Sequence, residues 1–173
     1  CAGLGYLAGR RSFADVLDDE ALRGFIGRTF TQEIMPALPL PKEQATQAVI
    51  SAFSRLENHQ NDMPLLEIGG GLLGGMPRSV LPAIRAYAER EFDAPKRLAL
   101  ALAAAVMLYA GARLNAGGQW EVARGEELSP IYDEAEVLAL FSTLAHDMPA
   151  ETLAYAVLAD RSLWGEDLRE IPG

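Results

Sequence analysis

Apolar positions recur at helical intervals along most of the chain. From Ser12 to Leu38, hydrophobic side chains return every three or four residues, and Ser12 and Asp15 have the spacing of a capping box. This segment is expected to form one long amphipathic helix. Its apolar positions are Leu22, Phe25, Ile26, Phe30 and Ile34.

Two further amphipathic helices are expected before residue 93. In the second helix, Pro41 suits the first turn. The apolar face of this helix is formed by Ala45, Ala48, Val49, Ala52, Phe53 and Leu56. The third helix begins near Ser79, because Pro82 restricts where it can start.

The most apolar stretch runs from Leu98 to Ala112. It is shorter than the roughly 20 residues that span a bilayer, so a buried core helix is expected. Residues 115–130 are polar and turn-rich and predict a short hairpin or a loop. A helix capped by Asp133 and Glu136 and a shorter helix at residues 149–160 follow.

These elements predict an all-α fold, a single domain of several helices. The pattern contains no alternating strands, no β-α-β rhythm and no internal repeat. At 173 residues, half of them apolar, the chain is long enough to bury its own core.

The composition of the chain disfavours several classes of binding partner. Fifteen Lys and Arg against 24 Asp and Glu give a net charge of −9, which disfavours nucleic acid and anionic membranes. The single cysteine cannot form an internal disulfide, so a reducing, cytoplasmic setting is expected. One cysteine and two histidines are too few for a Cys/His metal cluster, so no metal is expected. The start at Cys1 has no signal-peptide pattern and suggests a fragment of a longer protein.

The stretch "IGGGLLGGMPR", residues 68–78, places five glycines in seven positions. Gly69, Gly71 and Gly74 formally match the G-x-G-x-x-G pattern of dinucleotide-binding loops. Such a loop must follow a buried strand and open onto a helix, whereas Pro77 interrupts the helix expected here. A helix end or close-packed backbone is the better interpretation.

Few side chains suggest chemistry on their own. His59, in a polar run, is either a general base or substrate contact or a solvated loop residue. His146 suits a helix C-terminus, where a cation interacts favourably with the helix dipole. Arg10 and Arg11 could meet an anionic substrate or another domain, or simply be solvated. No Ser/His/Asp or Cys/His spacing is present.

Three stretches carry a more specific signal. They are "GLGYLAGRRSFADVLDDEALRGFIGRTFTQEIMPAL", "RLENHQNDMPLLEI" and "SVLPAI" with "PKRLALALAAAVMLYAG", and the ending "VLADRSLWGEDLREIPG". In order and without large gaps, they resemble the C-terminal helical domain of the long-chain polyol dehydrogenases, or mannitol dehydrogenase family, with most likeness to its tagaturonate reductase (altronate oxidoreductase) branch.

This resemblance implies a two-domain, NAD-dependent dehydrogenase acting on CH–OH groups. An N-terminal Rossmann domain of the same protein would hold NAD, and the helical domain would contact a sugar acid or polyol substrate. In the family, the catalytic Lys, Asn and His lie immediately before the segment that begins this chain. Residues 1–173 are therefore expected to be the helical substrate domain alone, without catalytic residue or bound cofactor, and inactive by itself.

The resemblance also suggests the substrate contacts. They are Arg55, Asn58, His59 and Arg78. Where relatives carry an Asn, a Lys and an Arg, an ungapped match places Gly71, Gly75 and Ser79. The alternative is a non-catalytic helical interaction domain, or an inactive paralogue, that keeps the fold and has lost the substrate site.

Overall fold

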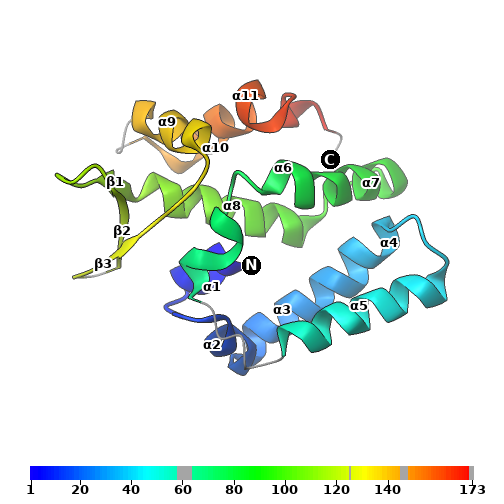
Figure 1. Ribbon diagram of the computed structural model, residues 1–173. Coiled ribbons are helices and arrows are strands. Elements are labelled where there is room, and N and C mark those ends of the chain that lie inside the picture. Colours follow the sequence, from blue (N-terminus) through cyan, green and yellow to red (C-terminus); the bar gives the residue numbers. More distant parts are fainter. Residues whose placement is uncertain (58–63, 125, 145–147, 172–173) are drawn as a thin grey trace.

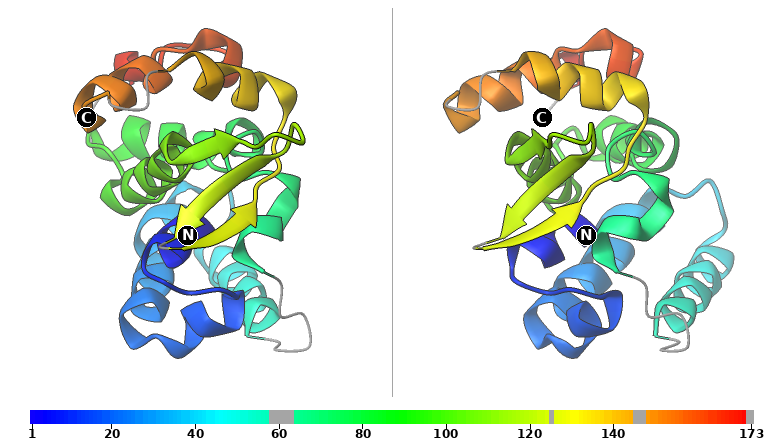
Figure 2. Two further views of the ribbon diagram at one scale, coloured as in Figure 1. Left: turned by 90° about the vertical axis from the view of Figure 1, so that its left-hand side faces the viewer. Right: turned by 60° about the vertical axis from the view of Figure 1, so that its left-hand side comes forward.

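Helix α8 (Lys96–Ala110) lies at the centre of the computed structural model, which describes residues 1–57, 64–124, 126–144 and 148–171. Helices α9 to α11 lie on one side of α8 and helices α1 to α5 on the other (Figures 1 and 2). Eight residues of α8 are buried, among them Leu102, Val106 and Tyr109. The predicted core helix is confirmed, and no helix among the described residues is long and apolar enough to cross a membrane.

The predicted long helix from Ser12 to Leu38 is wrong as a single element. The chain forms α1 (Ala2–Leu7), α2 (Phe13–Asp18), α3 (Glu20–Thr29), the π-helical turn η1 (Phe30–Ile34) and α4 (Met35–Ala37). The capping box of Ser12 and Asp15 is confirmed. The break lies at Asp19, whose backbone is extended and whose carboxylate accepts the N–H groups of Ala21 and Leu22 at 2.9 and 3.0 Å. A second N-cap thus starts a new helix.

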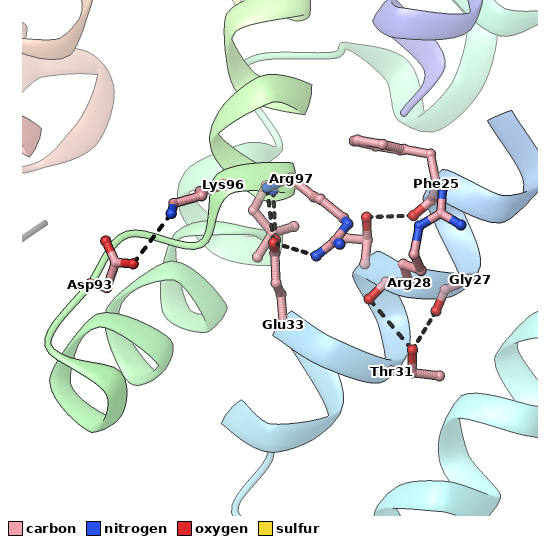
Figure 3. A network of polar contacts seen from close by, with 10 residues as sticks. Phe25, Gly27, Arg28, Thr31, Glu33, Asp93, Lys96 and Arg97 are labelled. Atoms are coloured by element: carbon pink, nitrogen blue, oxygen red, sulfur yellow. Dashed lines mark hydrogen bonds and ion pairs between the residues drawn. The ribbon is translucent and has the colours of Figure 1, made fainter. Parts of the chain in front are cut away.

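A buried carboxylate joins the π-helical turn η1 to the start of α8 (Figure 3). Glu33 is only 2% exposed. It accepts the backbone N–H groups of Arg97 and Leu98 at 2.9 and 2.8 Å, and Arg97 Nη1 lies 3.2 Å from it. Helix α8 begins after Pro95 without a side-chain cap of its own, so Glu33 satisfies N–H groups that would otherwise lack acceptors.

The second predicted helix is confirmed as α5 (Lys42–Leu56), which Pro41 precedes. The glycine-rich stretch follows as η3 (Leu65–Gly70), a loop, and the short helix α6 (Met76–Ser79). The third predicted helix is present as α7 (Leu81–Glu91), with Pro82 in its first turn.

A small antiparallel sheet covers one end of α8 (Figure 1). Its strands are β1 (Ala112–Leu114), β2 (Trp120–Arg124) and β3 (Glu127–Pro130), in the order β1-β2-β3. Buried Val122 pairs with Ala112 on one side and Ser129 on the other. The mostly helical fold is confirmed, and the hairpin anticipated at residues 115–130 exists with a third strand added. Strand β1 escaped prediction because it begins at Ala112, the last residue of the apolar run that predicts the core helix.

The last elements are α9 (Ala135–Thr143), α10 (Ala150–Leu158), α11 (Arg161–Trp164) and η4 (Leu168–Glu170). The predicted cap formed by Asp133 and Glu136 is wrong. The residue at the N-cap of α9 is Glu134, which makes no side-chain capping hydrogen bond. Asp133 is used for a different contact, described below.

Candidate functional site

A pocket of about 560 Å³ opens between α1, α3, α8 and the glycine-rich segment. Its volume lies within the range of small-molecule sites. The lining residues are Cys1, Ala2, Gly3, Phe13, Ile26, Phe30, Leu56, Gly71, Leu72, Gly75, Met76, Arg78, Ser79, Val80, Ala101 and Ala105. Most of these residues are apolar, so the few polar groups decide what the pocket can bind.

The glycine-rich segment and α6 form one wall of this pocket. Gly71, Gly75 and Ser79 all line it, and these are the positions where the resemblance places polar residues in relatives. The two glycines contribute no side chain. Ser79 donates its hydroxyl to the Gly75 carbonyl oxygen at 2.8 Å, within its own helical turn.

Asp133 forms hydrogen bonds to the backbone of this wall. Its carboxylate accepts the backbone N–H groups of Leu73 and Gly74 at 2.9 and 3.0 Å, and the Tyr109 hydroxyl also donates to it. The Tyr109 oxygen in turn accepts the N–H of Leu72 at 3.1 Å. Three consecutive N–H groups of the wall are therefore bonded to one Asp–Tyr pair, which connects the loop to α8 and to the start of α9.

The same carboxylate explains two of the glycines. A Cβ atom at Gly74 would lie 2.5 Å from Asp133 Oδ1, and one at Gly71 would also collide with the Asp133 carboxylate. Gly71 has a φ of 152°, which residues with a side chain rarely adopt. The interpretation as close-packed backbone is supported, because at these positions the glycines make room for Asp133.

Burial and the neighbouring Asp133 carboxylate raise the pKa of Tyr109 far above its usual value. The Tyr109 hydroxyl therefore remains a neutral donor throughout the physiological pH range.

Arg78 is the predicted contact that the pocket includes. Its Nη2 atom lies 2.5 Å from Oε1 of Glu134, and the side chains of Arg78 and Glu134 are 73% and 46% exposed. The hydrogen bond with Glu134 raises the pKa of Arg78. The cation at the pocket's edge is thus paired with a carboxylate of the same chain.

The other predicted contacts are not brought together with Arg78. Arg55 is exposed on α5, where its Nε donates to its own helix at the Ser51 carbonyl oxygen, 3.2 Å away, and the neighbouring Leu56 lines the pocket instead. Asn58 and His59 lie outside the described residues, as does His146.

Arg10 and Arg11, considered above as contacts for an anionic substrate, both form ion pairs with carboxylates of this chain. Arg10 pairs with Asp19 at 2.5 Å, and Arg11 pairs with Glu127 at 2.9 Å.

Sequence reasoning missed Asp133 and Tyr109. The density of glycines was a signal that something approaches the backbone closely there. It did not say what, because the partner lies about 60 positions further along the chain.

The glycine-rich segment does not fit a dinucleotide. The turns of η3, rather than a strand, precede it, and α6 has only four residues, including Pro77. The N–H groups of Leu73 and Gly74, which a phosphate would need, are bonded to Asp133. Among the described residues, no cluster of three or more His, Cys, Asp or Glu side chains could hold a metal ion.

The fold and the pocket define a mostly helical domain with a cavity of small-molecule size. In sequence, the chain is similar to proteins named altronate oxidoreductase. It is 32% identical to that of Pectobacterium carotovorum, 31% to that of Yersinia enterocolitica and 30% to that of Bacteroides thetaiotaomicron. These alignments cover 96–97% of this chain and 33–34% of each relative, so the chain spans about a third of their length. The resemblance to this oxidoreductase group is confirmed, and no protein-family model matches the chain.

Proposed function

We propose that this chain is the helical C-terminal substrate domain of an NAD-dependent oxidoreductase of the altronate oxidoreductase kind, which interconverts altronate and tagaturonate or a related sugar acid or polyol pair. Similarity over nearly the whole chain to proteins of that name carries the proposal. The pocket supports it, because the positions matched to polar residues in relatives line one cavity of suitable size.

In this proposal the chain supplies the substrate side of the site only. NAD and the general acid/base belong to the portion of the protein outside these residues, since the glycine-rich segment offers no dinucleotide loop. The apolar surface around Phe30 and Met76 would exclude water from a bound substrate. Arg78 would supply a polar contact at the edge of the pocket, with Arg55, Asn58 and His59 remaining as further predicted contacts.

The test is oxidation of NADH with tagaturonate, fructuronate or fructose, using the two-domain protein that the proposal implies. We expect turnover of at least one of these substrates. We also expect Gly75→Trp to abolish turnover, because position 75 lines the pocket and the nearest atom to its Cβ is the Gly71 carbonyl oxygen at 3.7 Å. Glu89→Trp, on the exposed side of α7, is the matched control and should retain activity.

A folded protein that binds NADH but turns over none of the three substrates would contradict the proposed reaction and favour the non-catalytic helical domain. The 173-residue chain alone should show no NADH binding in a fluorescence titration. Micromolar affinity there would contradict the assignment of the cofactor to the other domain.

A further inference from the structure

The charges at the pocket's rim determine which ligands it admits. Among the described lining residues, Arg78 is the one charged side chain, and the remaining polar side chains are Ser79 and Cys1. A carboxylated ligand would need a cation or several free N–H donors to offset the loss of its hydration. Among the side chains of the lining, Arg78 is therefore the cation on which an anionic ligand would depend.

Arg78 already forms an ion pair with a carboxylate of this chain. Glu134, at the N-cap of α9, places Oε1 2.5 Å from Arg78 Nη2. Both side chains are well exposed, so this pair is weak and reversible, and a ligand carboxylate competes with Glu134 for Arg78. Such a ligand would still have to approach with its own charge close to that of Glu134.

The backbone donors of the wall are also taken. The N–H groups of Leu73 and Gly74 point to the Asp133 carboxylate, and the N–H of Leu72 points to the Tyr109 hydroxyl. An internal carboxylate thus occupies the turn that could otherwise bind an anion. The net charge of −9 adds a general repulsion of anions.

We propose that Glu134 is a specificity-determining residue, which excludes anionic ligands from the pocket by pairing with Arg78, so that the pocket takes a neutral, hydroxyl-bearing molecule of sugar size in preference to a sugar acid. This inference rests on the proposed function and decides between its two substrate classes. Asp133 contributes by keeping the wall's N–H groups from binding an anion.

The test compares a neutral ketose, fructose, with a carboxylated one, tagaturonate, on the two-domain protein that the proposed function implies. Binding is followed by NMR at the methyl groups of Ile26, Met76 and Val80, which line the pocket. In the unmodified chain, fructose should shift these signals in a saturable way. Tagaturonate should bind at least about fivefold more weakly, because its carboxylate is repelled by the negative charge of Glu134 by about 1 kcal/mol.

Glu134→Gln removes the competing charge and leaves Arg78 in place. This variant should bind tagaturonate about fivefold more tightly than the unmodified chain and fructose equally well. Glu136→Gln is the matched control, because Glu136 is exposed in the first turn of the same helix and the substitution changes the net charge by the same amount. It should change neither affinity.

The outcomes separate the two proposals. If tagaturonate binds the unmodified chain as tightly as fructose, or if Glu134→Gln and Glu136→Gln have equal effects, the role of Glu134 is refuted and the substrate domain stands. If neither sugar shifts the pocket methyl signals, the assignment of this chain as a substrate domain fails, and the inference fails with it.

Discussion

The contact between Gly74 and Asp133 explains why each of these residue types stands at its position. The carboxylate sits where a side chain at position 74 would begin, and it accepts the N–H of the same glycine at 3.0 Å. Neither residue is explained by its local sequence, because Asp133 has the spacing of a helix cap and Gly74 that of a nucleotide loop. Their roles follow only from the contact between them, which is why this part of the site could not be predicted.

Gly74→Ala should lower the free energy of unfolding by about 2 kcal/mol, because the new methyl group must push the Asp133 carboxylate away from the N–H groups that it accepts. In an Asp133→Ala background the same substitution should cost less, since one of the two obstructing side chains is gone and only that of Glu134, 2.8 Å from the Cβ position, remains. Urea denaturation of the four proteins in the cycle measures this. Gly75→Ala, whose methyl group would lie at an ordinary contact distance of 3.7 Å from the Gly71 carbonyl oxygen, is the control and should stay within about 0.5 kcal/mol. Equal costs of Gly74→Ala in both backgrounds would disprove the explanation.

At the scale of elements, helices were predictable where their apolar stripes are long, and boundaries were not. The spacing of Ala45 and Val49 predicted α5, and the run from Leu98 predicted α8. The break at Asp19 and the π-helical turn at Glu33 were missed because the hydrophobic period continues through them. Both breaks serve polar contacts, which a count of apolar positions does not register.

Glu33→Ala should lower the free energy of unfolding by about 3 kcal/mol, because it leaves the N–H groups of Arg97 and Leu98 without an acceptor at the buried start of α8. Glu33→Gln should cost less, since its amide oxygen can still accept one of them. The comparison requires chemical denaturation of both variants. Glu89→Ala, at an exposed position of α7, serves as the control. If Glu33→Ala proves as mild as that control, the cap contributes nothing to stability.

At the scale of the whole molecule, the sequence predicted a mostly helical domain, and Arg78, one of the substrate contacts that the resemblance suggests, lines a pocket. The sequence did not predict the pocket's other walls, which come from α1, α3 and α8 and meet only in the folded chain. Local periodicity reports which face of a helix is buried, but not which distant segment covers it. The pocket is therefore a property of the tertiary packing.

The stability of the whole molecule should fall in acid over a defined range. The hydrogen bond and charge of Arg169 lower the pKa of Asp167 to about 2, and backbone N–H groups lower the pKa values of Asp15 and Asp19. A carboxyl group with a lowered folded pKa stabilises the protein above its unfolded pKa, near 3.9, and that contribution is lost as the pH falls through the folded value. Unfolding free energies should therefore decline from about pH 4 towards pH 2.

Asp167→Asn tests this assignment, because asparagine can still accept the N–H of Arg169 but carries no charge. The variant should be less stable than the unmodified chain at pH 7, and the two should converge as the pH approaches 2. Urea unfolding at a series of pH values provides the measurement. A difference that stays constant down to pH 2 would mean that the ion pair of Asp167 and Arg169 does not contribute.

The bond between Asp133 and the glycine-rich wall also sets an order of events during synthesis. The N–H of Leu73 finds its acceptor 60 residues further along the chain. At the usual pace of translation, about 5–20 residues per second, that acceptor emerges from the ribosome roughly 3–12 s after the segment that it holds. Until then the wall has glycines where side chains could have fixed its shape. The glycine-rich wall of the pocket therefore cannot take its final form until Asp133 has been made.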